Sequence, residues 1–220
     1  MSTAAASGGG WLSSLVDAVV ALMDVIGPYG AGIAIAAENV FPPLPSEAIL
    51  PMAGLAAQRG SFALWEAILW TTVGSLTGAL LLYGIGAWFG LERLRRIADR
   101  MPLVKVQDVD RTVAWFDRHG GKAVFFGRFI PIFRSLISIP AGVVRMPLWR
   151  FALLTTLGSL IWNTAFVLVG WYLGESWHIV APYMDTFQNV VLVAVAAAVA
   201  VFLFIRIRAH LRTRRNGSVD

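Results

Sequence analysis

Residues Glu38-Asn-Val-Phe-Pro-Pro-Leu-Pro-Ser-Glu47 place two carboxylates and three prolines inside apolar sequence. A second interruption reads Gly127-Arg-Phe-Ile-Pro-Ile-Phe-Arg-Ser135 and carries two guanidinium groups. Proline removes a backbone donor and breaks helices, so neither stretch is expected to cross a bilayer as a regular helix. Charge at membrane depth is costly and usually marks a pair or a function. The two stretches therefore predict broken helical hairpins that face each other with opposite charges at their tips.

The composition is that of an integral membrane protein. Of the 220 residues, 57% are hydrophobic and 14% are charged, with a mean hydropathy of +0.69, whereas a soluble domain carries about 25% charged residues. The net charge of +5 does not indicate nucleic-acid binding, because the Lys and Arg residues cluster beside apolar segments, as on a cytoplasmic membrane face. The absence of Cys excludes disulfides and thiolate metal sites. We expect an all-α membrane fold in a single domain.

The expected segments are a flexible tail over 1–10, a membrane domain over 11–208 and a basic cytoplasmic tail over 209–220. The membrane domain would hold hairpin 1 at about 31–58, a helix at 66–90, a cytoplasmic loop at 91–122, hairpin 2 at about 123–145, and helices at 149–173 and 187–205. A further helix over 11–26 would be about 24 Å long, which is short for a hydrocarbon core of about 30 Å. An interfacial or tilted helix and a short span both stay open for it.

The charges of the loops predict the topology. Residues 91–122 carry eight Lys or Arg against five acids, residues 206–215 carry five Arg and no acid, and residues 174–186 have no Lys or Arg. Basic segments stay in the cytoplasm, and a crossing at 123–145 would put the Arg tail outside. Hairpin 2 is therefore expected to enter and leave from the cytoplasm, hairpin 1 from outside, with a cytoplasmic C-terminus. Within the cytoplasmic loop, an amphipathic helix is expected over 109–119, closed by Gly120-Gly121.

Three pairs of segments indicate an internal repeat. They are Thr71-Thr-Val-Gly-Ser-Leu76 with Thr155-Thr-Leu-Gly-Ser-Leu160, Gly86-Ala-Trp-Phe-Gly90 with Gly170-Trp-Tyr-Leu-Gly174, and Pro51-Met-Ala-Gly54 with Ile139-Pro-Ala-Gly142. The charge argument makes the two units run in opposite directions, which is the inverted-repeat plan of many transporters. The alternative is that small residues recur in membrane helices because they permit close packing.

The guanidinium groups of Arg128 and Arg134 are candidate phosphate ligands, with the Ser135 hydroxyl beside them. Arg stays charged when buried and presents a planar fork that matches phosphate. The alternative is that both Arg side chains only pair with the carboxylates of the first hairpin and hold the hairpins together. Ser135 and Ser46 are either hydroxyl donors to a ligand or caps of the helical breaks.

The carboxylates Glu38 and Glu47 are candidate proton-coupling groups. A low-dielectric cavity favours the protonated carboxyl group, and such groups serve as proton relays in transporters. The alternative is structural pairing. The residues expected to break the hairpins are Pro42, Pro43, Pro45, Pro131, Pro140, Gly54 and Gly142. No His lies near either hairpin and no Cys or His pair has metal spacing, so no metal or cofactor is expected.

The motifs resemble those of the DedA family, also called SNARE-associated or VTT-domain proteins. The resemblance rests on Glu38 with Pro42-Pro-Leu-Pro-Ser-Glu47 and Ala53-Gly54, and on Gly127-Arg-Phe-Ile-Pro-Ile-Phe-Arg-Ser135 with Pro140-Ala-Gly142. Many members carry Gly-Asp-Ser where this chain has Pro-Ser-Glu47, so carrying the role over to Glu47 assumes that Glu replaces Asp. The resemblance implies two opposed re-entrant hairpins, lipid translocation in the bacterial inner membrane, and recycling of undecaprenyl phosphate with proton coupling.

The sequence leaves three classes of function to compare. The first is a non-enzymatic transporter that moves a polyprenyl phosphate, from the outer to the inner leaflet, with proton coupling. The second is a phospholipid scramblase or an ion antiporter. The third is a polyprenyl diphosphate phosphatase, for which Ser135 is the one nucleophile worth testing. The expected partners are a lipid phosphate, protons and membrane lipids, without nucleic acid; homo-oligomer formation stays open.

Overall fold

The computed structural model of the chain describes residues 11–40, 46–100, 106–131 and 133–176, and single positions between 186 and 204. Within these residues the chain is helical and contains no strand, which agrees with the predicted all-α class. The predicted tails at 1–10 and 209–220, and all but single positions of the predicted helix at 187–205, lie outside the described residues.

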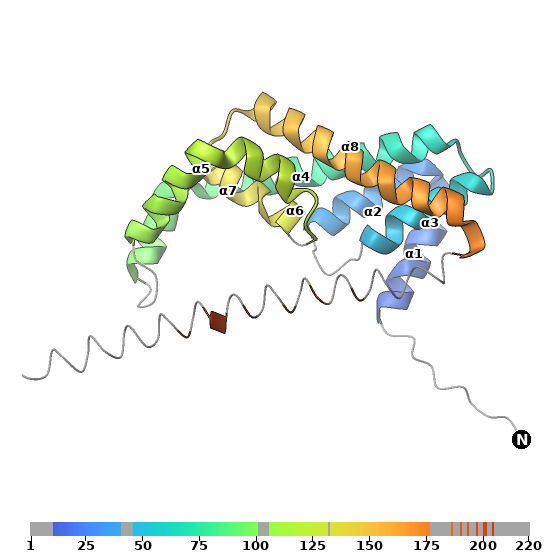
Figure 1. The fold of residues 1–220 in the computed structure, drawn as a ribbon, viewed down its shortest axis with the longest axis horizontal. Helices are drawn as coiled ribbons and strands as arrows, with labels where there is room; N and C mark the ends of the chain where they lie inside the picture. The colour runs from blue at the N-terminus through green and yellow to red at the C-terminus, as the bar shows by residue number, and fades with distance from the viewer. Residues whose placement is uncertain are drawn as a thin grey trace, which may run out of the picture.

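The helices follow one another with short connections. In chain order they are α1 (Trp11–Ile26), α2 (Pro28–Val40), α3 (Ser46–Gln58), α4 (Leu64–Arg100), α5 (Val106–Gly127), α6 (Phe133–Leu136), α7 (Ser138–Val143), α8 (Leu148–Leu173) and the 3-10 helix η1 (Gly174–Ser176). Helices α4 and α8 run past each other in opposite directions, with α2 and α3 towards one end and α5 to α7 towards the other (Figure 1).

Local sequence signals explain where the first helices begin and end. Helix α1 stops at Gly27, whose φ of +62° is the left-handed conformation that favours glycine at a helix C-terminus. Helix α4 begins with a carboxylate cap, because Glu66 Oε2 accepts a hydrogen bond of 2.7 Å from the Ala63 N–H. The predicted helix over 66–90 ends at Gly90, which has φ 70° and ψ 163°; helical residues resume beyond this kink and reach Arg100.

The predicted loop at 91–122 is helical wherever the structure describes it, in the end of α4 and in α5. The predicted closure of an amphipathic helix at Gly120-Gly121 is wrong, since α5 continues to Gly127. A Cβ at Gly120 would lie 2.7 Å from the Phe116 ring, and one at Gly121 would lie 2.7 Å from the Arg150 guanidinium. These two glycines therefore provide space for neighbouring side chains and do not terminate the helix.

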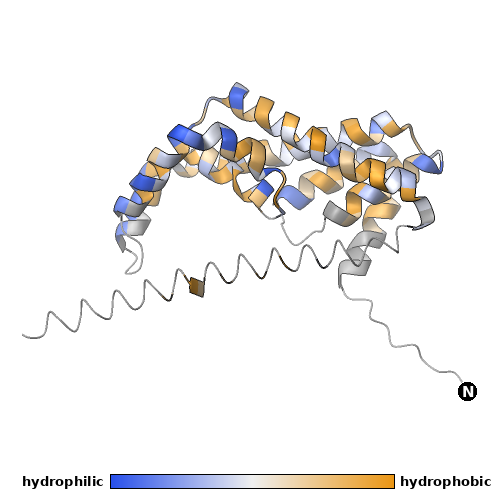
Figure 2. Cartoon of the chain, in the orientation of Figure 1, coloured by the Kyte–Doolittle hydropathy of each residue, from blue (hydrophilic) through white to orange (hydrophobic). Residues whose placement is uncertain are grey.

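Among the described residues, two helices are long and apolar enough to cross a bilayer, Leu64–Arg96 and Leu148–Leu173. Both expose large apolar side chains along their length, among them Leu81 on α4 and Ile161 on α8. Figure 2 shows hydrophilic residues gathered at the end formed by α5 and the last turns of α4, and apolar residues over much of the remainder. An apolar outer surface of this extent is expected of a protein whose solvent is lipid.

Two short helices cross the two long ones at glycines. A Cβ at Gly54 of α3 would collide with the Val167 carbonyl oxygen of α8, and a Cβ at Gly142 of α7 would collide with the Tyr83 carbonyl oxygen of α4. The reverse contacts are equally close, because Gly170 lies on the backbone of Pro51 and Gly86 on that of Ile139. Small residues thus allow backbone-to-backbone packing at both crossings.

Candidate functional site

The second interruption brings two guanidinium groups into the interior. Helix α5 ends at Gly127, the Arg128 N–H donates to the Phe125 carbonyl at 3.2 Å, and Pro131 separates this turn from α6. Arg128 is 2% exposed and Arg134 is 3% exposed. In a continuous helix, residues 128 and 134 would lie on different faces. The proline break allows both charged side chains to lie in the interior.

Arg134 forms an ion pair with Glu38, a residue of the last turn of α2. The two side chains are almost fully buried, and Arg134 Nη2 donates to Glu38 Oε2. The next residue of each segment also makes contact, since Ser135 Oγ donates to Asn39 Oδ1 at 3.1 Å. A pair of adjacent residues on α6 therefore binds a pair of adjacent residues on α2, and the opposite charges of the two interruptions meet inside the protein.

Asn39 connects this contact to the long helix α4. Its Nδ2 donates to the Ser75 carbonyl at 3.3 Å and to the Ile35 carbonyl at 3.2 Å. Gly78 lies against the Asn39 Cβ, where any side chain at position 78 would collide. The Asn39 side chain is thus fixed by hydrogen bonds at its amide and by Gly78 at its Cβ. It positions Ser135, and with it the neighbouring Arg134.

Arg128 contacts two hydroxyl groups through one of its three nitrogens. Its Nη2 donates to Ser138 Oγ and to Thr155 Oγ1, both at 3.2 Å. Its Nε and Nη1 are buried and have no hydrogen-bond partner among the described residues. One nitrogen of the guanidinium is therefore hydrogen-bonded, while the N–H donors of the other two are unused within the described residues.

Comparison with known proteins identifies the family. The VTT domain matches residues 44–172, more than half of the chain. The chain belongs to the VTT-domain, or DedA, family. It is 37% identical over 159 residues to undecaprenyl phosphate transporter A of Staphylococcus aureus, covering 71% of this chain and 78% of that protein. The Bacillus subtilis protein of the same name is 30% identical over 182 residues, covering 83% and 89%.

Another relative of this DedA-family chain carries a different kind of name. An alkaline phosphatase-like protein of Lactococcus lactis is 39% identical over 181 residues, covering 80% of this chain and 85% of the relative. No solved structure gives a significant match. Family membership together with two helices apolar enough to span a bilayer makes the chain a membrane protein.

The family motifs are placed as follows in the structure. Ser46 and Glu47 begin α3, but their side chains lie outside the described residues, as do Pro42, Pro43 and Pro45. Pro131 is buried in the break before α6. Pro140 lies within α7. Gly54 lies within α3 and Gly142 within α7, each where its helix crosses a long helix. These glycines act through close packing and not by interrupting a helix.

Three polar residues of the site were not among the predicted site residues: Asn39, Ser138 and Thr155. The sequence did contain a signal for two of them. Asn39 follows the charged Glu38, and Thr155 opens the segment Thr155–Leu160, whose similarity to Thr71–Leu76 indicated only a repeat. In the described part of the chain, no three His, Cys, Asp or Glu side chains lie together as a metal site requires.

Proposed function

We propose that this protein is a non-enzymatic transporter that moves the phosphate headgroup of a polyprenyl lipid, undecaprenyl phosphate, across the bacterial inner membrane. The names of the Staphylococcus and Bacillus relatives support this substrate. The lipid tail would stay in the bilayer while the headgroup passes through the protein. Only the headgroup then needs a polar path, and the partners are a lipid phosphate, protons and the surrounding lipids.

The observation that carries the proposal is a buried ion pair beside a second buried guanidinium. Glu38 and Arg134 neutralise each other, while Arg128 retains two nitrogens without partners among the described residues. Burying an ion pair gives little net stability compared with apolar packing, so its presence here favours a functional role. A phosphate entering the site would accept from Arg128, Arg134 and the Ser135 hydroxyl, in a charge-assisted geometry that suits Arg.

The same pair suggests how protons would drive transport. Protonation of Glu38 would remove its charge and release Arg134 to bind phosphate, and deprotonation would draw Arg134 back and release the ligand. Glu47, at the start of α3, would serve as the second proton carrier. The test is the pH dependence of transport in Glu38→Gln and Glu47→Gln: each profile should flatten, and a profile like that of the unmodified protein would remove that residue from coupling.

The architecture we propose is an inverted repeat of a re-entrant hairpin followed by a long helix. The supporting contacts occur in matching pairs. Gly54 of α3 packs on Val167 of α8, and Gly142 of α7 packs in the same way on Tyr83 of α4. The helical part of hairpin 2, Phe133–Val143, would be about 16 Å long and too short for a core of about 30 Å. Opposite entry sides follow from the loop charges, with the C-terminus in the cytoplasm.

A labelling experiment tests this topology. The chain has no Cys, so single cysteines report position without background. Ser61→Cys, in the exposed connection before α4, should react with an impermeant maleimide from outside intact cells. Lys122→Cys, exposed on α5, should react only after the membrane is opened. Labelling of both positions from the same side would overturn the arrangement.

The transport proposal is tested in liposomes containing the purified protein. Arg128→Ala and Arg134→Ala should each abolish translocation of undecaprenyl phosphate. Arg128→Lys should lose most of it, because a point charge replaces a bidentate fork. The matched control is Arg111→Ala, which removes an exposed Arg from α5 and should transport normally. Full translocation by both buried-Arg variants would refute a phosphate-binding role, and equal movement of neutral lipids would favour a scramblase.

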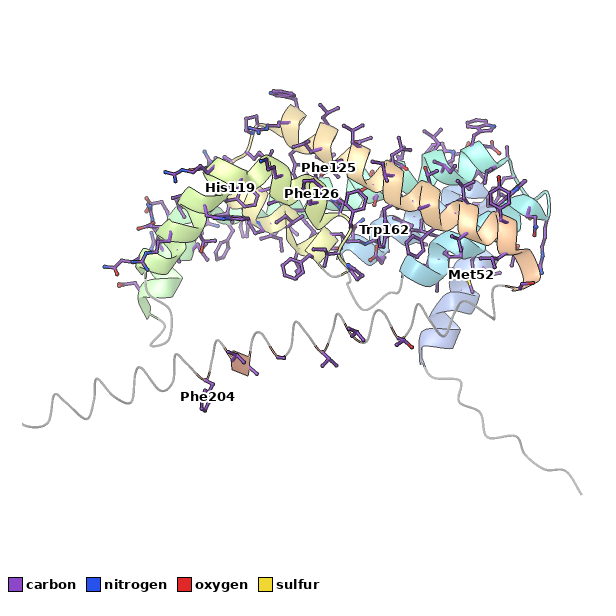
Figure 3. The ribbon with its side chains drawn as sticks, viewed as in Figure 1. Met52, His119, Phe125, Phe126, Trp162 and Phe204 are labelled. Carbon is purple, nitrogen blue, oxygen red and sulfur yellow. The ribbon has the colours of Figure 1, made fainter. Side chains whose placement is uncertain are left out.

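The Lactococcus name makes a phosphatase the second candidate. The nucleophile would be Ser135, whose hydroxyl donates to Asn39 in the structure. His119, the histidine of the described residues, lies exposed on α5 and contacts the Trp115 carbonyl, away from the site (Figure 3). We therefore expect no phosphate release from undecaprenyl diphosphate by the purified protein. Release that disappears in Ser135→Ala would establish the enzyme instead.

A further inference from the structure

A row of polar side chains runs along the buried face of α8. Thr155, Ser159 and Asn163 are spaced four residues apart and so lie on one face of the helix. Their exposed fractions are 0%, 2% and 0%. The same face is apolar at both ends, with Phe151 before the row and Val167 after it. The polar row is therefore enclosed within the protein and does not reach the lipid-facing side of α8.

Most of the polar atoms in this row have no partner. Thr155 Oγ1 accepts from Arg128, but Ser159 Oγ and both amide atoms of Asn163 are buried without a hydrogen-bond partner among the described residues. The indole Nε1 of Trp162, which lies in the middle of α8 (Figure 3), is in the same condition. A buried polar group without a partner is destabilising. Several such groups lie on two turns of one helix, and a bound ligand would supply the partners that they lack.

The unpartnered nitrogens of Arg128 belong to the same region. Gly158 allows Arg128 to approach α8, because a Cβ at position 158 would lie 3.0 Å from the Arg128 Cβ and Cγ. The hydroxyls of Thr155 and Ser138 then hold Nη2, which leaves Nε and Nη1 free of partners in the described part of the chain. The row on α8 therefore begins at the Arg128 guanidinium and extends two turns beyond it.

We propose that Ser159 and Asn163, with Arg128 Nε and Nη1, form an anion subsite on α8 that binds phosphate oxygens apart from the Arg134–Glu38 pair. The hydroxyl, the amide NH2 group and the guanidinium together supply donors, and a fully ionised phosphate presents only acceptors. The ligand class is a phosphate group, on a lipid or as free phosphate. This subsite rests on the proposed function, since it places the transported headgroup along α8.

The other long helix offers an internal contrast. In the repeated segments Ser75 matches Ser159, and it accepts a hydrogen bond from Asn39 through its carbonyl. Three residues beyond each segment, Ala79 stands where α8 has Asn163. A packing role common to both helices would not require an amide on one of them alone. The amide at 163 is thus specific to the helix that contacts Arg128.

The test measures binding and stability together in the full-length protein in phosphatidylcholine nanodiscs. The probes are inorganic phosphate and undecaprenyl phosphate. Asn163→Leu should weaken binding of the lipid phosphate by roughly tenfold or more, as expected for a lost hydrogen bond to a charged group, without lowering the melting temperature. Asn163→Asp, which keeps the size of the side chain, should weaken it further by repulsion. Thr72→Val, which removes another unpartnered buried hydroxyl, is the control and should bind normally.

The outcomes separate the two proposals. If Arg128→Ala loses binding while Asn163→Leu and Ser159→Ala bind like the unmodified protein, the row holds water only and the subsite is overturned, while the transporter proposal stands. If the unmodified protein binds neither probe, both proposals fall. Weakened binding of undecaprenyl phosphate but not of inorganic phosphate in Asn163→Leu would assign the subsite to the lipid headgroup. If both weaken, the subsite recognises phosphate itself.

Discussion

Helices α4 and α8 have similar packing but different polar interiors. Each is crossed by a short helix at a glycine: α7 crosses α4 at Gly142, and α3 crosses α8 at Gly54. On α4, Thr71 Oγ1 donates to the Ala67 carbonyl and the Ser75 carbonyl accepts from Asn39. On α8, the corresponding row leaves Ser159 and Asn163 without partners among the described residues. The shared contacts build the scaffold, and the difference is the basis of our proposal that phosphate binds on the α8 side.

The largest effect is expected at the ion pair between Glu38 of α2 and Arg134 of α6. Glu38→Ala or Arg134→Ala leaves one buried charge without its partner and should reduce the free energy of unfolding by about 3–5 kcal/mol. The double variant Glu38→Ala with Arg134→Ala should lose less than the sum of the two single losses. Thermal unfolding in detergent measures all three. If the two single losses add up in the double variant, Glu38 and Arg134 do not stabilise each other.

Substitutions at the two glycine crossings should have similar effects on stability. Gly54→Ala and Gly142→Ala each force a Cβ into a backbone carbonyl and should lower the free energy of unfolding by about 1–3 kcal/mol. Gly84→Ala on α4 is the matched control, since no atom lies within 4 Å of its added Cβ, and it should be neutral or stabilising by up to about 1 kcal/mol. If only one of the two variants loses stability, the crossing of α3 with α8 and the crossing of α7 with α4 are packed differently.

The paired and unpaired amides should respond differently. Asn39→Leu leaves Ser135 Oγ without its acceptor and should reduce the free energy of unfolding by about 1–3 kcal/mol. Asn163→Leu removes an amide that has no partner among the described residues and should leave stability unchanged or raised. Melting temperatures of the two variants, measured in parallel without ligand, make the comparison. A larger loss in Asn163→Leu would place the structural role on α8.

The smallest effect concerns the exit from hairpin 2. Tyr83 Oη donates to the Met146 carbonyl at 2.6 Å, beside Arg145, whose φ of 52° is unusual for a side chain with a Cβ. Tyr83→Phe should reduce the free energy of unfolding by about 1 kcal/mol and leave phosphate binding intact. A loss of binding in this variant would extend the site to the end of α7.

The sequence predicted the class of fold and the polar centre better than the details around them. Prolines and charges located the interruption at Pro131 and the residues Glu38, Arg128 and Arg134, because charge within apolar sequence is rare and informative. It did not predict that α5 passes through Gly120-Gly121, since the contacts with Phe116 and Arg150 are tertiary.

The polar row on α8 was missed for a similar reason. Thr155, Ser159 and Asn163 are scattered through a mostly apolar stretch that also contains Thr156, and small polar residues are common in membrane helices. Nothing in the order of residues shows which of these groups has a partner. Only the position of α8 against Arg128 and Ser138 distinguishes a satisfied hydroxyl from an available one.

The most direct measurement is an electron cryomicroscopy structure of the protein in nanodiscs containing undecaprenyl phosphate. The phosphate should lie within hydrogen-bond distance of Arg128 Nε or Nη1, between α6 and α8, with the polyprenyl chain leading to the lipid. Phosphate density at the exposed Arg residues of α5, with the Arg128 fork bound only to protein groups, would contradict the account.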